Sequence, residues 1–114
     1  MGKYLQIRVS ANTFNEDDVK KAWPSLWNLI WDEGGDRVPK KGVMELALAA
    51  YDAVRAGLVE ARVAEALKEG AEEAARPYHA IEKALADRAP TEADRLSYEL
   101  EDSLDRLEDI AKKF

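Results

Sequence analysis

All three tryptophans of this chain lie four residues apart in one segment, at Trp23, Trp27 and Trp31. A spacing of four places side chains on one face of a helix, so the largest apolar groups form a single stripe. We expect this stripe to be a core seam that packs against the following helix. The alternative is a protein-contact surface, because tryptophan is enriched among interface anchors. The three tryptophans are therefore the candidate interaction residues.

Local signals predict two helices around and after this stripe. Asn15 is a good helix N-cap, and three acidic residues follow it in the first turn. Pro24 should either kink the tryptophan-rich helix or end it, with a restart that places the proline in the first turn. Gly34-Gly35 is expected to stop this helix. A second, apolar helix is predicted from residue 39 or 40 to residue 56, with Gly57 as the break.

The second half of the chain is also helical by pattern. A helix over residues 58–76 carries a slim stripe of small and apolar side chains, which lets a neighbouring helix approach closely. Pro77 should kink or end this helix, and a shorter helical piece follows. Thr91 is the expected cap of the last helix, in which leucines recur at spacings of three and four. We expect its carboxylates to be solvated surface, not a weak cation site: Glu99, Glu101, Asp102, Asp105, Glu108 and Asp109.

Residues 4–10 alternate in the manner of a half-buried β-strand. Leu5, Ile7 and Val9 form one face, and Gln6, Arg8 and Ser10 form the other. The sequence shows no second segment with this alternation. A lone strand leaves backbone hydrogen-bonding groups unpaired, so we predict that it pairs with a second copy of the chain. The alternative is an extended arm that lies on the helices.

With 114 residues, the chain is long enough for one domain with one modest core. We expect a mainly α fold, a small bundle of about four helices with one short N-terminal β-strand or extended arm. Residues 1–14 would form the strand or arm, and residues 15–57 the tryptophan-rich and apolar helices. Residues 58–114 would form an acidic helical half.

Charge and composition limit the partners. Residues 1–57 carry eight basic and eight acidic side chains, whereas residues 58–114 carry nine basic and fifteen acidic ones. An acidic surface repels phosphate groups, which disfavours nucleic acid as a partner of the second half. The sequence has no cysteine and no apolar run long enough for a bilayer, so we expect a cytoplasmic protein without membrane contact.

The residue types that usually carry chemistry are scarce. His79 is the only histidine, and with Glu82 it supplies two of the three or four ligands that a transition-metal site needs. The few serines and threonines lie in no recognisable catalytic motif, and no glycine-rich phosphate loop is present. We therefore predict no metal, no cofactor and no catalytic residues, and expect that the chain is not an enzyme.

The order of strand, helix, glycine turn and helix over residues 4–56 resembles a ribbon-helix-helix repressor. In that family two chains pair their N-terminal strands, and outward side chains read bases in the major groove. The resemblance implies that Gln6, Arg8 and Ser10 are the candidate nucleic-acid contacts. Two departures are the proline within the first helix and a first half that is not basic.

Three functions from different classes follow from these observations. The leading one is a non-enzymatic protein-interaction or assembly module that self-associates as a homodimer, binds an unknown protein, or both. The alternative is a dimeric DNA-binding regulator that uses the N-terminal strand. The third is an enzyme or ligand binder whose site is assembled from scattered polar residues.

Overall fold

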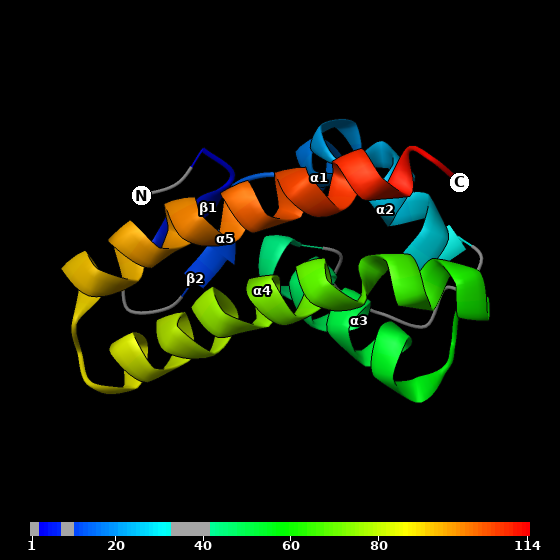
Figure 1. Cartoon of the computed structure of the whole chain (residues 1–114). Coiled ribbons are helices and arrows are strands. Elements are labelled where there is room, and N and C mark those ends of the chain that lie inside the picture. Colours follow the sequence, from blue (N-terminus) through cyan, green and yellow to red (C-terminus); the bar gives the residue numbers. More distant parts are fainter. Residues whose placement is uncertain (1–2, 8–10, 33–41) are drawn as a thin grey trace.

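Two long helices, α4 (Ala61–Ala86) and α5 (Pro90–Ala111), run antiparallel and form the platform on which the other elements pack (Figure 1). The computed structural model describes residues 3–7, 11–32 and 42–114. The predicted mainly α fold is confirmed, with five α-helices and a short N-terminal sheet. The smaller elements are β1 (Leu5–Ile7), β2 (Ala11–Thr13), α1 (Glu16–Ala22), α2 (Pro24–Trp27), a π-helical turn (Asn28–Asp32) and α3 (Val43–Ala56).

Small side chains bring α4 close to α5, as the sequence predicts. Gly70 lies on α4 where an added Cβ would stand 2.8 Å from Cδ2 of Leu107 on α5. The leucines of α5 face this contact and are buried, among them Leu100 and Leu104. The interhelical spacing therefore depends on the absence of a side chain at position 70.

Two expected helix boundaries in the second half are wrong. Pro77 does not end α4, which continues from Ala61 to Ala86, so the alternative in which the helix stops there is wrong. Pro77 and the neighbouring Ala74 and Ile81 are buried, and this packing offsets the backbone hydrogen bond that proline cannot make. Thr91 does not cap α5, because Pro90 takes its first position, which suits the fixed φ of proline.

The expectation that the N-terminal strand lacks a partner in its own chain is also wrong. β1 pairs antiparallel with β2, with Leu5 opposite Thr13 and Ile7 opposite Ala11. The sequence of β2, Ala-Asn-Thr, has no apolar alternation, so its strand character was not visible in the pattern. Leu5 and Ile7 point into the core, as predicted. The hairpin removes the premise for strand pairing between two copies.

Carboxylates of α5 hold the N-terminal segments in place. Both oxygens of Glu101 accept hydrogen bonds from the backbone amides of residues 3–5, at 2.9, 3.0 and 3.0 Å. Glu108 accepts the amides of residues 25 and 26 in the first turn of α2, at 3.2 and 2.8 Å. Glu101 and Glu108 are buried, so the prediction of a fully solvated acidic face is wrong for them. They satisfy amide donors that no strand or helix bond uses.

Within the tryptophan-rich segment, a new helix begins at Pro24, so the segment is not one kinked helix. α1 ends at Ala22, Trp23 leaves the helical conformation, and Pro24 occupies the first position of α2. This is one of the two alternatives that the sequence left open. The predicted cap at Asn15 is confirmed, because its side chain accepts a hydrogen bond from the amide of Asp17 at 3.0 Å. The predicted stop at Gly34-Gly35 lies outside the described residues.

The hairpin also caps the helix that follows it. Thr13 of β2 accepts a hydrogen bond on Oγ1 from the amide of Val43, the first residue of α3, at 2.9 Å. Gly42 precedes that residue, and a Cβ added there would collide with Oγ1 of Thr13. At the other end, α3 stops at Gly57 with φ 69°, as predicted. Residues 39–41 of the expected helix lie outside the described part of the chain.

Gly42→Ala should therefore destabilise the fold by about 1–2 kcal/mol, because the new methyl group displaces Thr13 from the start of α3. Denaturant unfolding compares this variant with Thr13→Ala, which removes the same cap without a clash. We expect losses in both. Unchanged stability of Gly42→Ala would contradict the close approach of Thr13.

Candidate functional site

The three tryptophans differ in how far their side chains are buried. Trp23 is fully buried, its Nε1 donates a hydrogen bond to Oδ1 of Asp105 at 2.8 Å, and its ring meets Tyr4 edge-on at 5.2 Å. Trp31 is also buried, with 2% of its surface exposed. Trp27 is half-buried and packs edge-on against Trp31 at 5.7 Å. Trp27 is therefore the one tryptophan of the three that keeps substantial exposed surface.

The surroundings of Trp27 are charged. It lines an open hollow of about 540 Å³ together with Glu16, Asp17, Lys20, Lys21 and Pro24. The ammonium group of Lys20 lies 4.6 Å from the ring centre of Trp27. A lysine of the same chain thus already covers part of this indole by a cation–π contact.

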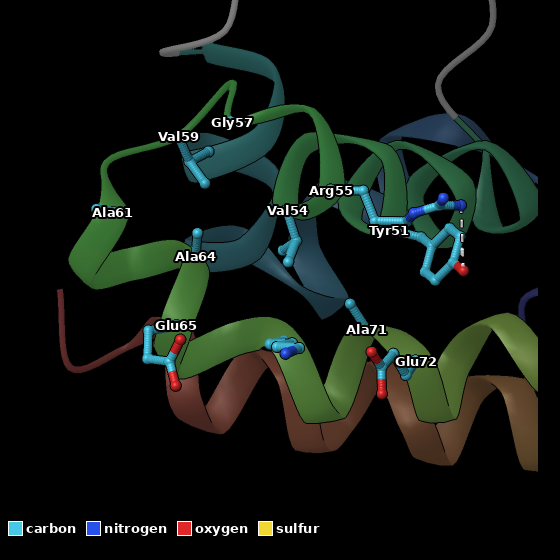
Figure 2. A pocket seen from close by; sticks show the side chains of 11 residues that line it. Tyr51, Val54, Arg55, Gly57, Val59, Ala61, Ala64, Glu65, Ala71 and Glu72 are labelled. Carbon is cyan, nitrogen blue, oxygen red and sulfur yellow. Dashed lines mark hydrogen bonds between the residues drawn. The ribbon is translucent and has the colours of Figure 1, made fainter.

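A second hollow lies between α3 and α4 and is lined by both apolar and charged side chains. This groove has a volume of about 540 Å³ and runs between the C-terminal end of α3 and the first half of α4 (Figure 2). Val54 of α3, Val59 of the α3–α4 link, and Ala64 and Ala71 of α4 form its apolar lining. Pockets of this size accommodate small ligands or a few side chains of a protein partner.

The sequence explains why the groove stays open. Gly57 adopts a left-handed conformation, which ends α3 and turns the chain toward α4. Alanines occupy the α4 positions that face α3 here, at Ala61, Ala64 and Ala71. Larger apolar side chains at these positions would fill the space. The alanine-rich composition of α4 is evident in the sequence. The groove is not, because it also depends on the left-handed backbone conformation of Gly57, which sets how α3 and α4 lie relative to each other.

Polar and charged side chains form the rim of the groove. On α3, the guanidinium of Arg55 lies 5.2 Å from the ring centre of Tyr51, and its Nη1 donates to the Tyr51 hydroxyl at 3.4 Å. On α4, Glu65, Lys68 and Glu72 lie along one face, three and four residues apart. Within the described residues, none of these four charged side chains forms an ion pair.

Two exposed apolar residues lie near the start of α4, one by its position in the chain and one by a contact with Arg62. Leu58, which precedes Val59, is 68% exposed, the largest exposed fraction of any large apolar side chain described. Phe114 is 43% exposed, and the guanidinium of Arg62, in the first turn of α4, lies 5.1 Å from its ring centre. The beginning of α4 therefore combines a concave apolar lining with protruding apolar side chains.

Of the three candidate nucleic-acid contacts, the described residues include only Gln6. Gln6 is half-buried in β1 opposite Asn12, and Arg8 and Ser10 lie outside the described residues. The amide of Leu5 donates to Glu101 at 3.0 Å. An α5 carboxylate therefore already uses a donor of β1 that a second strand would need.

The residues considered for metal binding or proton transfer are dispersed. Nδ1 of His79 lies 3.6 Å from Oε1 of Glu82, and both side chains are largely exposed. Across residues 3–7, 11–32 and 42–114, no group of three or more metal-ligating side chains converges. Burial raises the pKa of Tyr78, and the negative charges of Glu82, Glu45 and Asp52 raise it further. The phenol of Tyr78 is therefore even less acidic than that of an ordinary tyrosine.

Among the described helices, none combines the length and the apolar character that crossing a bilayer requires. Comparison of the chain with protein-family models, with curated proteins and with solved structures gives no match.

Proposed function

We propose that this chain is a non-enzymatic protein-interaction module and that the groove between α3 and α4 is its contact surface. The observation that carries the proposal is the set of apolar side chains in the lining of the groove, together with Leu58, which precedes the lining residue Val59 and is 68% exposed. Exposed apolar surface around a concavity is typical of surfaces that bind other molecules. Tyr51 and Arg55 on the rim belong to the residue types that most often anchor interfaces.

The proposed partner is a different protein. Self-association was expected because β1 had no visible strand partner, and β2 now fills that position. The proposal therefore no longer includes a strand-paired homodimer. Light scattering at micromolar concentration should give the mass of a single chain.

The regulator that reads DNA with its N-terminal strand is a weaker candidate. That mode requires β1 to pair with β1 of a second chain. In this structure β1 lies between β2 on one side and the Glu101 carboxylate on the other. No described feature favours this function over binding of a protein.

The proposal predicts that blocking the groove abolishes binding without unfolding the protein. Ala64→Arg places a long charged side chain in the groove from a half-exposed position. Ala66→Arg is the matched control, because Ala66 is exposed on the same helix and does not line the groove. In the native host, tagged Ala66→Arg should recover the same proteins as the unmodified chain, in the same amounts. Ala64→Arg should lose at least one of them about tenfold or more.

Circular dichroism and a denaturant melt establish that both variants are folded. Equal recovery of every co-purified protein by the two variants would contradict the groove as the contact surface.

A further inference from the structure

We infer that the occupant of the groove is an amphipathic helix of a partner protein, with charges of both signs in a defined order beside its apolar face. On the flank that meets α4, the order is basic, acidic, basic. The opposite flank carries an acidic residue. This inference rests on the proposed function and specifies the chemistry of its partner.

The backbone of the walls favours a helix over an extended peptide. Both walls are helices, α3 and α4, whose internal carbonyls and amides already bond to each other. Such walls offer no strand edge that could pair with an extended segment. An occupant must therefore satisfy its own backbone groups, which a helix does.

The length of the groove suits a short helix. Its lining on α4 extends from Ala61 to Glu72, which corresponds to about 17 Å at 1.5 Å per residue. A partner helix would place about three turns along this distance. Apolar side chains at spacings of three and four would then reach Val54 and Ala64, which Figure 2 shows on α3 and α4.

The order of charges on the rim determines the order of opposite charges that a matching partner helix would carry. Glu65 and Glu72 are seven residues apart on α4, and Lys68 lies between them on the same face. A helix lying beside α4 would match them with basic, acidic and basic residues at similar spacing. Arg55 lies on the α3 wall, so an acidic residue on the facing flank of the partner helix would pair with it. The pattern on the α4 flank reads the same in both chain directions, so it does not depend on the orientation of the partner.

The same rim disfavours a partner whose charged groups are all negative or all positive. A polyanion such as a nucleic acid would meet Glu65 and Glu72, and a strongly basic segment would meet Lys68 and Arg55. Each juxtaposition of like charges opposes binding. The rim therefore selects a pattern of charge, not a net charge.

Two synthetic peptides of identical composition test this inference. Both are about 18 residues long and have the same apolar face, with circular dichroism used to match their helicity. The first has the flank order basic, acidic, basic, with an acidic residue opposite, and the second has every charge inverted. Both have the same net charge. Isothermal titration calorimetry with the full chain should show the first peptide binding roughly tenfold more tightly at low salt.

Charge reversal at two rim positions should remove this preference. With Glu65→Lys combined with Glu72→Lys, each peptide meets two opposite and two like charges, so the two peptides should bind about equally. Glu69→Lys with Glu82→Lys is the control, because these residues lie on α4 but do not line the groove, and it should keep the original preference. Three results would overturn the inference: equal binding of both peptides by the unmodified chain, no binding of either peptide by that chain, or an unchanged preference after Glu65→Lys with Glu72→Lys. The proposed function would still stand if Ala64→Arg alone lost its partner, because the groove would then hold an occupant of another kind.

Discussion

Replacing Glu101 with alanine should lower the free energy of unfolding by about 2–4 kcal/mol, a large effect for a glutamate on the last helix of a small protein. The carboxylate is 7% exposed and accepts three backbone amides from residues 3–5. Without it, these donors keep no partner at the start of β1, and the amide of Leu5 is buried. Hydrogen bonds to a charged acceptor are among the stronger ones in proteins.

Asp102→Ala provides the matched control for this prediction. Asp102 is the next residue on α5 and is exposed, so its removal should change stability by less than about 0.5 kcal/mol. Chemical denaturation of both variants at neutral pH gives the comparison. If Glu101→Ala lost less than about 1 kcal/mol, its carboxylate would not hold the N-terminal segment as described.

Trp23→Ala should cost about 3–5 kcal/mol, the expected loss for a large aromatic side chain removed from a core. Trp23 is fully buried, contacts Tyr4 edge-on and donates a hydrogen bond to Asp105. Trp27→Ala is the comparison within the same stripe. Because Trp27 is half-buried, its loss should be less than half as large.

Unfolding monitored by far-UV circular dichroism measures both tryptophan variants without depending on tryptophan fluorescence. A Trp27 variant as unstable as the Trp23 variant would contradict the observed order of burial. The sequence alone suggested that the whole stripe packs as a core seam. Trp23 and Trp31 are in the core as this prediction requires, and Trp27 is partly buried and packs against the core.

Helix content and helix ends were predictable where local chemistry decides them. Asn15 caps α1, Gly57 ends α3, and the leucine spacing of α5 gives a buried face, all as expected from the sequence. That α4 continues through Pro77 was not predictable, because the cost of a proline inside a helix is local, whereas the burial of Pro77 depends on tertiary packing. Helix propensities, which describe the local sequence, do not include that packing.

The burial of two α5 carboxylates was likewise not predictable from the local sequence. Glu101 and Glu108 are acidic residues in a charged stretch of sequence, as are the exposed Asp102 and Asp109 beside them. They differ only in what packs above them, which is backbone from residues 3–5 and 25–26. Nothing in the periodicity of the sequence marks an amide donor about 80 to 100 residues away. The groove was missed for a related reason, since Val54, Val59 and Ala64 are adjacent only after α3 and α4 fold together.

Site-specific photo-crosslinking tests whether the groove between α3 and α4 contacts a partner, because a crosslink identifies the surface that touches another protein in the cell. A benzophenone amino acid is placed at Leu58, which precedes the lining residue Val59, or at Tyr98, which is 53% exposed on α5 and does not line the groove. We expect that Leu58 gives a crosslink to a distinct protein, that Ala64→Arg suppresses this crosslink, and that Ala66→Arg does not. The groove would not be the contact surface if the Leu58 position gave no crosslink, or if Tyr98 crosslinked the same protein with equal yield in the presence of Ala64→Arg.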